Sequence, residues 1–156
     1  MTTGDPYDLQ RFVAAQDAGG TYDRAAAELR AGRKTSHWMW FVFPQIAGLG
    51  HSLMARRYAI ASLDEARAYL AHPLLGARLR ECAALVAAVE ARPLRAILGS
   101  PDDLKFHSSM TLFALAGGDQ PVFAQALDKY FAGALDLATL GILGLSSPSG
   151  GRTAPA

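Results

Sequence analysis

The segment from Lys34 to Gln45 combines side chains that can do chemistry with an unusual density of aromatic rings. It contains both tryptophans of the chain and two of its seven phenylalanines. His37 can donate, accept or titrate near neutral pH, which suits a general acid or base. Trp38 beside it offers a flat apolar wall and one N–H donor. The segment therefore predicts one wall of a pocket, although a structural histidine that caps a helix or binds a carbonyl group is an alternative interpretation.

A second cluster of polar side chains extends from Lys105 to Thr111. At helical spacing Lys105, Ser108 and Thr111 fall close to one face, and Ser109 lies beside them. A cation and hydroxyl groups on one face can hold a phosphate, a carboxylate or another anion. Hydroxyl groups within a helix also bond back to carbonyl groups one turn earlier, so a structural role fits the pattern equally well.

Three further side chains, His51, Arg56 and Arg57, form a possible third polar edge. Arginine favours planar anions, but adjacent arginines on a helix more often face water or an acidic neighbour, which makes these weaker candidates. Cys82, the only cysteine, lies in an alanine- and leucine-rich helical pattern that predicts a buried, inert thiol.

Composition and motifs narrow the classes of function. The chain has 15 basic and 14 acidic residues, a net charge of +1, so nucleic acid and anionic lipid are unlikely partners. There is no secretory signal pattern and no apolar run long enough to span a bilayer, and we expect a cytoplasmic protein without membrane contact. The four histidines lack the spacing of metal ligands on a helix, and the common nucleotide and hydrolase motifs are absent. We therefore predict no metal and no cofactor.

Helix signals recur along the chain and define the elements that position both clusters. Alanine is abundant, and the 51% hydrophobic content contains few β-branched residues outside short clusters. Asp5 and Ser100 are capping side chains followed by proline, and Ser62 begins a capping box. All three patterns predict helix starts. We expect Ser36 to cap a short helix that ends before Pro44. The expected fold is all-α, a compact single-domain bundle of seven to nine helices over residues 5–144, with a flexible C-terminal tail over residues 145–156.

Several segments occur in the order seen in a known family. Over about residues 7 to 143 the chain resembles domain of unknown function family 1810, whose uncharacterised members are sometimes mislabelled calpastatin. The segments that carry the resemblance are Asp8–Gln16, Lys34–Gln45 with Gly48-Leu49-Gly50, Tyr58-Ala59-Ile60, His72–Gly76 and Lys105–Phe113. The resemblance implies an all-helical fold and no established reaction. It places these residues in signature segments: Lys34, Ser36, His37, Trp38, Trp40, Pro44, Gln45, Lys105, Ser108, Ser109 and Thr111.

Together the two clusters predict a pocket for a small anionic or nucleotide-like ligand. Signature segments made only for packing would not require these polar residues, because unpaired buried polar groups destabilise a fold by about 1–3 kcal/mol each. The resemblance therefore favours a pocket over a purely structural role. His37 is the candidate catalytic residue of a possible metal-independent hydrolase or glycosyl-transfer enzyme. The predicted ligand-binding residues are Lys34, Ser36, Trp38, Trp40, Gln45, Lys105, Ser108, Ser109 and Thr111.

A second hypothesis is a non-enzymatic protein-interaction or structural module that uses the aromatic segment for packing or dimerisation. The sequence leaves open whether the protein is an enzyme, which ligand it binds and which oligomeric state it adopts.

Overall fold

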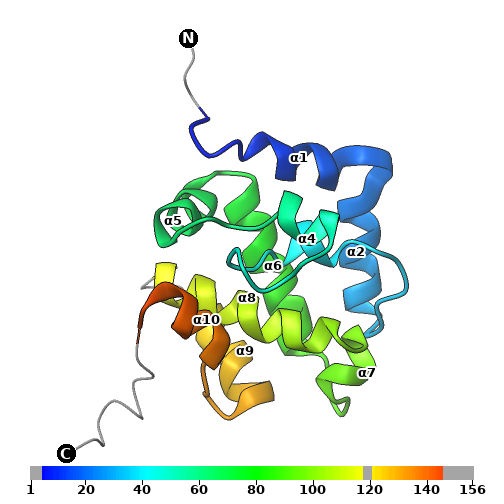
Figure 1. Ribbon diagram of the computed structural model, residues 1–156. Coiled ribbons are helices and arrows are strands. Elements are labelled where there is room, and N and C mark those ends of the chain that lie inside the picture. The colour runs from blue at the N-terminus through cyan, green and yellow to red at the C-terminus, as the bar shows by residue number, and fades with distance from the viewer. Residues whose placement is uncertain (1–4, 118–120, 146–156) are drawn as a thin grey trace, which may run out of the picture.

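The computed structural model describes residues 5–117 and 121–145, and within them the regular secondary structure is helical apart from one isolated β-bridge (Figure 1). The predicted all-α bundle is confirmed. From Ser146 onward the predicted tail lies outside the described residues. The helices, in chain order, are α1 (Gln10–Asp17), the 3-10 turn η1 (Ala18–Gly20), α2 (Thr21–Arg30), α3 (Met39–Val42), α4 (Leu53–Arg57), α5 (Leu63–Ala71), α6 (Leu75–Ala88), α7 (Leu94–Leu98), α8 (Asp102–Gly117), α9 (Pro121–Phe131) and α10 (Leu137–Leu143).

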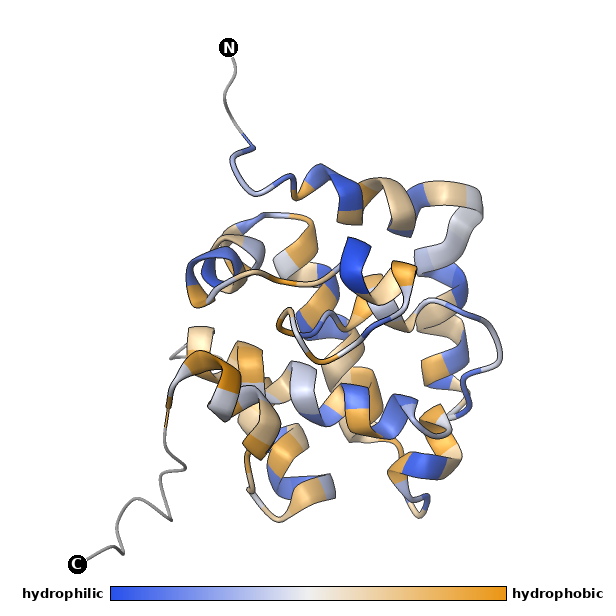
Figure 2. Ribbon diagram, viewed as in Figure 1, coloured by the Kyte–Doolittle hydropathy of each residue, from blue (hydrophilic) through white to orange (hydrophobic). Residues whose placement is uncertain are grey.

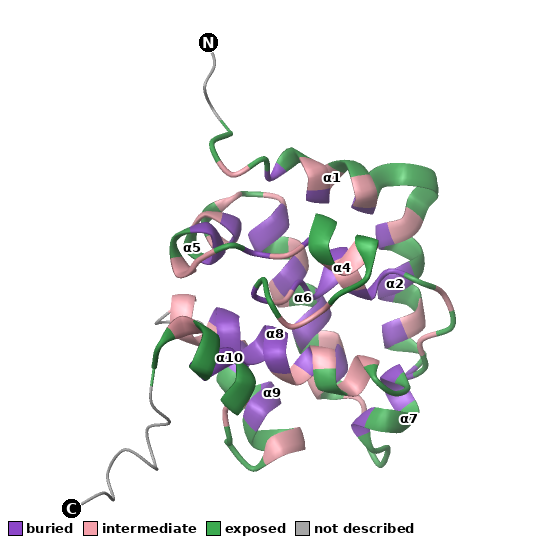
Figure 3. Ribbon diagram, in the orientation of Figure 1, coloured by how far each residue is buried: buried purple, intermediate pink, exposed green. Residues whose placement is uncertain are grey.

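Helix α8 lies at the centre of the bundle and packs against α5, α7, α9 and α10 (Figure 1). Phe106 and the run from Met110 to Phe113 are buried along it. Figure 3 shows much of α8 as buried, whereas α10 is mostly exposed although Figure 2 shows it as strongly hydrophobic. No helix among the described residues is long and apolar enough to cross a membrane. The core is therefore organised around the helix that carries the second polar cluster.

The start of α1 differs from the expectation of a helix directly after Asp5-Pro6. Asp8 adopts a left-handed conformation with φ 53°, which delays the helix until Gln10. The Asp5 carboxylate nevertheless accepts the amides of Leu9 and Gln10 at 2.6 and 2.9 Å. Asp5 thus accepts hydrogen bonds from amides at the helix start, as an acidic cap does. It lies four and five residues before these amides, farther along the chain than an ordinary cap residue.

The cap predicted at Ser62 forms. Its hydroxyl oxygen accepts the amide of Glu65 at 3.1 Å, and the Glu65 carboxylate accepts the amide of Ala61 at 2.9 Å. In a standard capping box the carboxylate would accept the amide of the cap residue itself, here Ser62, which is one residue later than Ala61. The carboxylate also binds Arg11 at 3.0 Å, which ties α5 to α1.

Helix α7 is not among the helix starts expected above, because proline within an apolar helical pattern is typical of a helix end. Pro93 instead occupies the position before the first residue of α7, with φ −70°. Proline is compatible with a helix start since its missing N–H is not needed there. Leu94, Ile97 and Leu98 are buried, so tertiary packing stabilises this short helix.

Candidate functional site

The first half of the aromatic segment is held by one carboxylate, that of Glu28 on α2. It accepts the amides of Thr35 and Ser36 at 2.9 and 3.1 Å, the Ser36 hydroxyl, and the indole N–H of Trp38 at 2.9 Å. Burial acts to raise the pKa of Glu28, but these hydrogen bonds outweigh it and lower the pKa to about 2. The polar atoms of Ser36 and Trp38 are therefore engaged within the protein, and Ser36 does not cap the short helix.

Trp38 belongs to the core. It is 0% exposed and packs against Phe43, whose ring meets Phe106 of α8 edge-on at 5.0 Å. Phe41 is also buried, whereas Trp40 is only half-buried. Trp38 therefore supports the fold, and Trp40 is the tryptophan with a ring surface free for a ligand or a partner.

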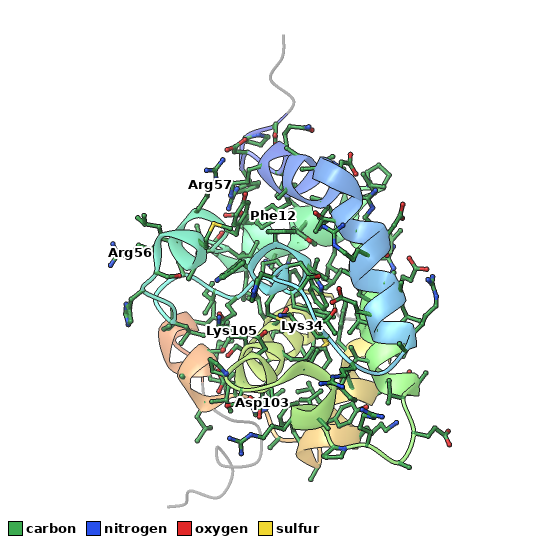
Figure 4. The ribbon with its side chains drawn as sticks, turned by 90° about the vertical axis from the view of Figure 1, so that its right-hand side faces the viewer. Phe12, Lys34, Arg56, Arg57, Asp103 and Lys105 are labelled. Carbon is green, nitrogen blue, oxygen red and sulfur yellow. The ribbon has the colours of Figure 1, made fainter. Side chains whose placement is uncertain are left out.

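The two predicted lysines converge on Asp102, the first residue of α8. Lys34 Nζ lies 2.9 Å from Asp102 Oδ2, and Lys105 Nζ lies 3.7 Å from Oδ1 of the same carboxylate. The side chain of Lys34 is only 8% exposed and that of Lys105 is 26% exposed. Figure 4 shows the two lysines close together at the centre of this face. Two ammonium groups share one carboxylate, which leaves one positive charge in excess.

Each of these lysines also faces a tryptophan ring. Lys34 Nζ lies 5.2 Å from the ring centre of Trp38, and Lys105 Nζ lies 5.7 Å from that of Trp40. Such cation–π contacts hold an ammonium group over a ring with less hydration than in free solution. The structure thus brings Lys34 and Lys105 together with both tryptophans, of which Trp38 is buried in the core.

A small cavity lies beside Trp40. Its volume is about 120 Å³. The amide of Ala47 donates to Ile60 and the amide of Ile60 donates to Gln45, at 2.8 and 2.9 Å, and this pairing joins two of the cavity walls. The lining includes Trp40, Gln45, Gly48, Gly50, Arg56 and Tyr58.

Gly50 sets the distance between the cavity loop and α4. A Cβ atom at this position would lie 2.5 Å from Cβ of Ala55, closer than such atoms approach in proteins. The glycine therefore allows α4 to close over the cavity. Arg56 contributes to the lining from α4, and Figure 4 shows it at the outer edge of the molecule.

The hydroxyl groups of α8 do not join Lys105. Ser108 lies 3.1 Å from Oδ2 of Asp136, and Thr111 Oγ1 accepts the amide of Asp136 at 2.9 Å. These two side chains hold the start of α10 against α8. Ser109 is fully buried, and its hydroxyl has no hydrogen-bond partner within the described residues. The groups expected to act together on one helical face therefore have different partners: Lys105 contacts Asp102, whereas Ser108 and Thr111 contact Asp136.

His37 is exposed, and no hydrogen bond or ion pair of the described residues includes it. His107 is the more constrained histidine: its ring stacks on Phe131 at 3.8 Å, and Nε2 lies 2.8 Å from the carbonyl oxygen of Ala134. A general acid or base must be held within hydrogen-bonding reach of its substrate. The structure positions His107 through contacts that link α8 and α9, and it supplies no comparable contacts for His37.

The sequence did not point to two carboxylates that shape this region, and a third residue was only a weaker candidate. Glu28 and Asp102 are the carboxylates to which the predicted residues bind, and Arg56 was ranked low although it lines the cavity. The three-residue spacing of Asp102 and Lys105 on one helix was a usable signal for their ion pair. The sequence offered no local signal for Glu28, because its partners belong to the following loop.

Comparison with known proteins gives a fold relationship. The protein is similar to the conserved hypothetical protein Rv1873 from Mycobacterium tuberculosis, known from a crystal structure at 1.38 Å. The two share 54% sequence identity with a TM-score of 0.87, and the match covers 91% of this chain and 100% of that chain. No curated protein matches. The family described as "Protein of unknown function (DUF1810)" matches residues 6–143, and the chain therefore belongs to this family.

Proposed function

We propose that this protein binds a small anionic ligand at Trp40, with the anion in the cavity between Trp40, Gln45 and Arg56. The observation that carries this proposal is the position of Trp40, with Lys105 over its ring and the cavity beside it. A half-buried aromatic ring flanked by cationic side chains combines a stacking surface with charge for an anion. Gln45 adds an amide group that both donates and accepts.

The excess charge around Asp102 supports an anionic rather than a cationic ligand. Asp102 is the carboxylate shared by Lys34 and Lys105, so it cannot neutralise both ammonium groups. Arg56 has no acidic partner among the ion pairs of the described residues. An anion near Trp40 would gain from both Lys105 and Arg56, which lie on α8 and α4.

The size of the cavity limits how much of a ligand enters. A volume of about 120 Å³ is smaller than the roughly 300–1,000 Å³ of drug-sized ligand sites and corresponds to about four waters at roughly 30 Å³ each. A phosphate or carboxylate group matches this space. In a nucleotide-like ligand only the anionic group would enter, and the flat base would lie along the exposed part of Trp40.

Catalysis is the less supported part of the sequence-based hypothesis. A metal-independent hydrolase or glycosyl-transfer reaction would need His37 to be oriented by a neighbour. The exposed position of His37 gives no such support, whereas the Trp40 cavity supports binding directly. We therefore propose ligand binding as the function, with turnover to be tested through a His37→Ala variant.

A thermal-shift screen of nucleotides, phosphorylated metabolites and inorganic phosphate tests the proposed binding. A ligand that binds only the native state stabilises it by about 2.7 kcal/mol at a hundred times its dissociation constant. We expect a rise in Tm for the wild type that is reduced in Trp40→Ala and Lys105→Ala. Arg67→Ala is the control, because it removes a positive charge from an exposed pair on α5.

Two outcomes would contradict the proposed binding. Either no ligand in the screen raises Tm, or the same rise occurs in the wild type, the control and both site variants. Because Trp40→Ala changes the protein surface near the core, the Tm of each variant without ligand serves as its own reference.

A further inference from the structure

A groove lined by three arginines lies along α2, and Glu28 is part of its lining. Its volume is about 490 Å³, which falls within the roughly 300–1,000 Å³ of small-molecule sites. The arginines come from separate parts of the chain: Arg24 from α2, Arg33 from the loop after it, and Arg92 from the segment between α6 and α7. The groove is thus formed by tertiary structure and is not a run of neighbouring charges.

The positive charges of these arginines are not matched by ion pairs. None of the three appears in an ion pair among residues 5–117 and 121–145. Arg24 donates only to neutral acceptors, the carbonyl of Gly19 at 3.3 Å and the hydroxyl of Thr21 at 3.2 Å. The guanidinium groups therefore keep their charge available within the groove.

Glu28 is the acidic residue of the lining, and its carboxylate already accepts the Thr35 and Ser36 amides, the Ser36 hydroxyl and the Trp38 indole. With three arginines and one glutamate, the lining has a formal charge of +2. Because the Glu28 oxygens are engaged by the loop, Glu28 lowers the total charge of the groove without offering a free acceptor to the arginines.

Arg92 is exposed, and its side chain passes close to the backbone at Gly32. A Cβ atom at Gly32 would lie 3.7 Å from Arg92 Nε and 4.0 Å from its Cδ, so the side chain extends across the glycine. Gly32 is buried and has φ +78°. Gly32 therefore leaves room for the Arg92 side chain to pass over the backbone, and a side chain at this position would contact it.

We propose that this groove is a second ligand site, separate from the Trp40 cavity, that binds the phosphate group of a small organic phosphate. Arginine matches phosphate oxygens through paired N–H donors, and Arg33 and Arg92 supply such forks from opposite segments. The hydroxyl of Thr35 adds a donor. Ala27 and Ala31 provide an apolar floor on which the organic part of the ligand rests.

Phenyl phosphate is the probe, titrated into ¹⁵N-labelled protein and followed through the Nε–Hε signals of the arginines and by calorimetry. We expect signals of Arg33 and Arg92 to shift, and phenyl phosphate to bind more tightly than inorganic phosphate because its ring covers the alanines. Arg33→Gln and Arg92→Gln should each weaken binding by about tenfold, the factor that corresponds to roughly 1.4 kcal/mol.

Arg95→Gln is the matched control, because this exposed arginine on α7 carries the same charge and does not line the groove. Lys105→Ala tests independence from the Trp40 cavity, and neither variant should change the affinity for phenyl phosphate. An equal loss in Arg95→Gln and Arg92→Gln would overturn the proposed site. So would equal affinity for phenyl phosphate and inorganic phosphate, or unshifted signals of Arg33 and Arg92.

Discussion

The indole N–H of Trp38 donates to the carboxylate of Glu28 at 2.9 Å, and this contact joins the core tryptophan to α2. The same carboxylate accepts two backbone amides and a hydroxyl from the intervening loop. A carboxylate with several donors is stabilised in its charged form. Glu28 therefore fixes both the part of the loop that follows Lys34 and the ring over which the Lys34 ammonium group lies.

Replacing Glu28 by Gln should lower the free energy of unfolding at pH 7 by about 1–3 kcal/mol, since hydrogen bonds to a charged acceptor are lost. The pKa of Glu28 is lowered in the folded protein from 4.5 to about 2. Stability from this group is therefore fully present above pH 4.5 and is lost as the pH falls towards 2. Denaturant unfolding at several pH values measures both effects.

The control for this variant is Glu90→Gln, which alters an exposed carboxylate with no hydrogen bond to the described residues. The stability difference between wild type and Glu28→Gln should shrink between pH 4.5 and 2, and the control should show no such pH dependence. A difference that stays constant over this range would contradict the assigned role of Glu28.

Replacing Asp102 by Asn should destabilise the protein by about 3 kcal/mol, because the nearly buried ammonium group of Lys34 loses its carboxylate. The same change should strengthen anion binding near Trp40, since Lys105 is also released from its acidic partner. Asp103→Asn removes an equal charge from the same helical turn and is the control. Weaker anion binding in Asp102→Asn than in Asp103→Asn would count against the proposed role of the lysines.

Replacing Gly50 by Ala should destabilise the protein by about 1–3 kcal/mol and reduce ligand binding in the Trp40 cavity. The added Cβ would lie 2.5 Å from that of Ala55 and would push α4 away from the loop. Gly141→Ala is the contrasting change, because no atom lies within 4 Å of its added Cβ. Gly141 lies within α10, so this variant should be about 0.5–1 kcal/mol more stable. Paired unfolding curves and a ligand titration check both expectations.

Replacing Ser109 by Ala should leave stability unchanged or raise it by up to about 1 kcal/mol, since the buried hydroxyl has no partner among the described residues. Thr111→Val is nearly isosteric but leaves the amide of Asp136 without its acceptor, and should destabilise by about 1–3 kcal/mol. Chemical unfolding compares the two. A loss above 1 kcal/mol in Ser109→Ala would show that its hydroxyl does have a stabilising partner.

Features that depend on nearby residues were predictable from the sequence. The cap at Ser62 follows from the four consecutive positions 62–65. Ser36 shows where local reasoning fails. Its sequence context suits a cap, but its hydroxyl binds Glu28 on the preceding helix instead. Whether the Ser36 hydroxyl accepts a helix amide or donates to Glu28 depends on how the loop folds back, which a local pattern does not encode.

The candidate site was predictable only in part for the same reason. The aromatic density around Trp38 could indicate either a core or a pocket, and the structure assigns Trp38 to the core and Trp40 to the cavity. Lys105 and Ser108 are three residues apart on α8, yet Lys105 faces Asp102 and Ser108 faces Asp136. Their spacing predicts that both lie near one another on a helix. Tertiary packing, which the spacing does not encode, determines which residue each side chain contacts.

The pairing of residues 45–47 with Ile60 has a consequence for motion. It closes a loop that contains α4, and α4 has no fully buried residue. Segments with few buried contacts open locally with a smaller free energy than global unfolding requires. Amide hydrogens of residues 53–57 should therefore exchange with deuterium much faster than those of the central run 106–113 in α8. The wall of the Trp40 cavity that carries Arg56 would then be its most mobile side, able to open while the bundle stays folded.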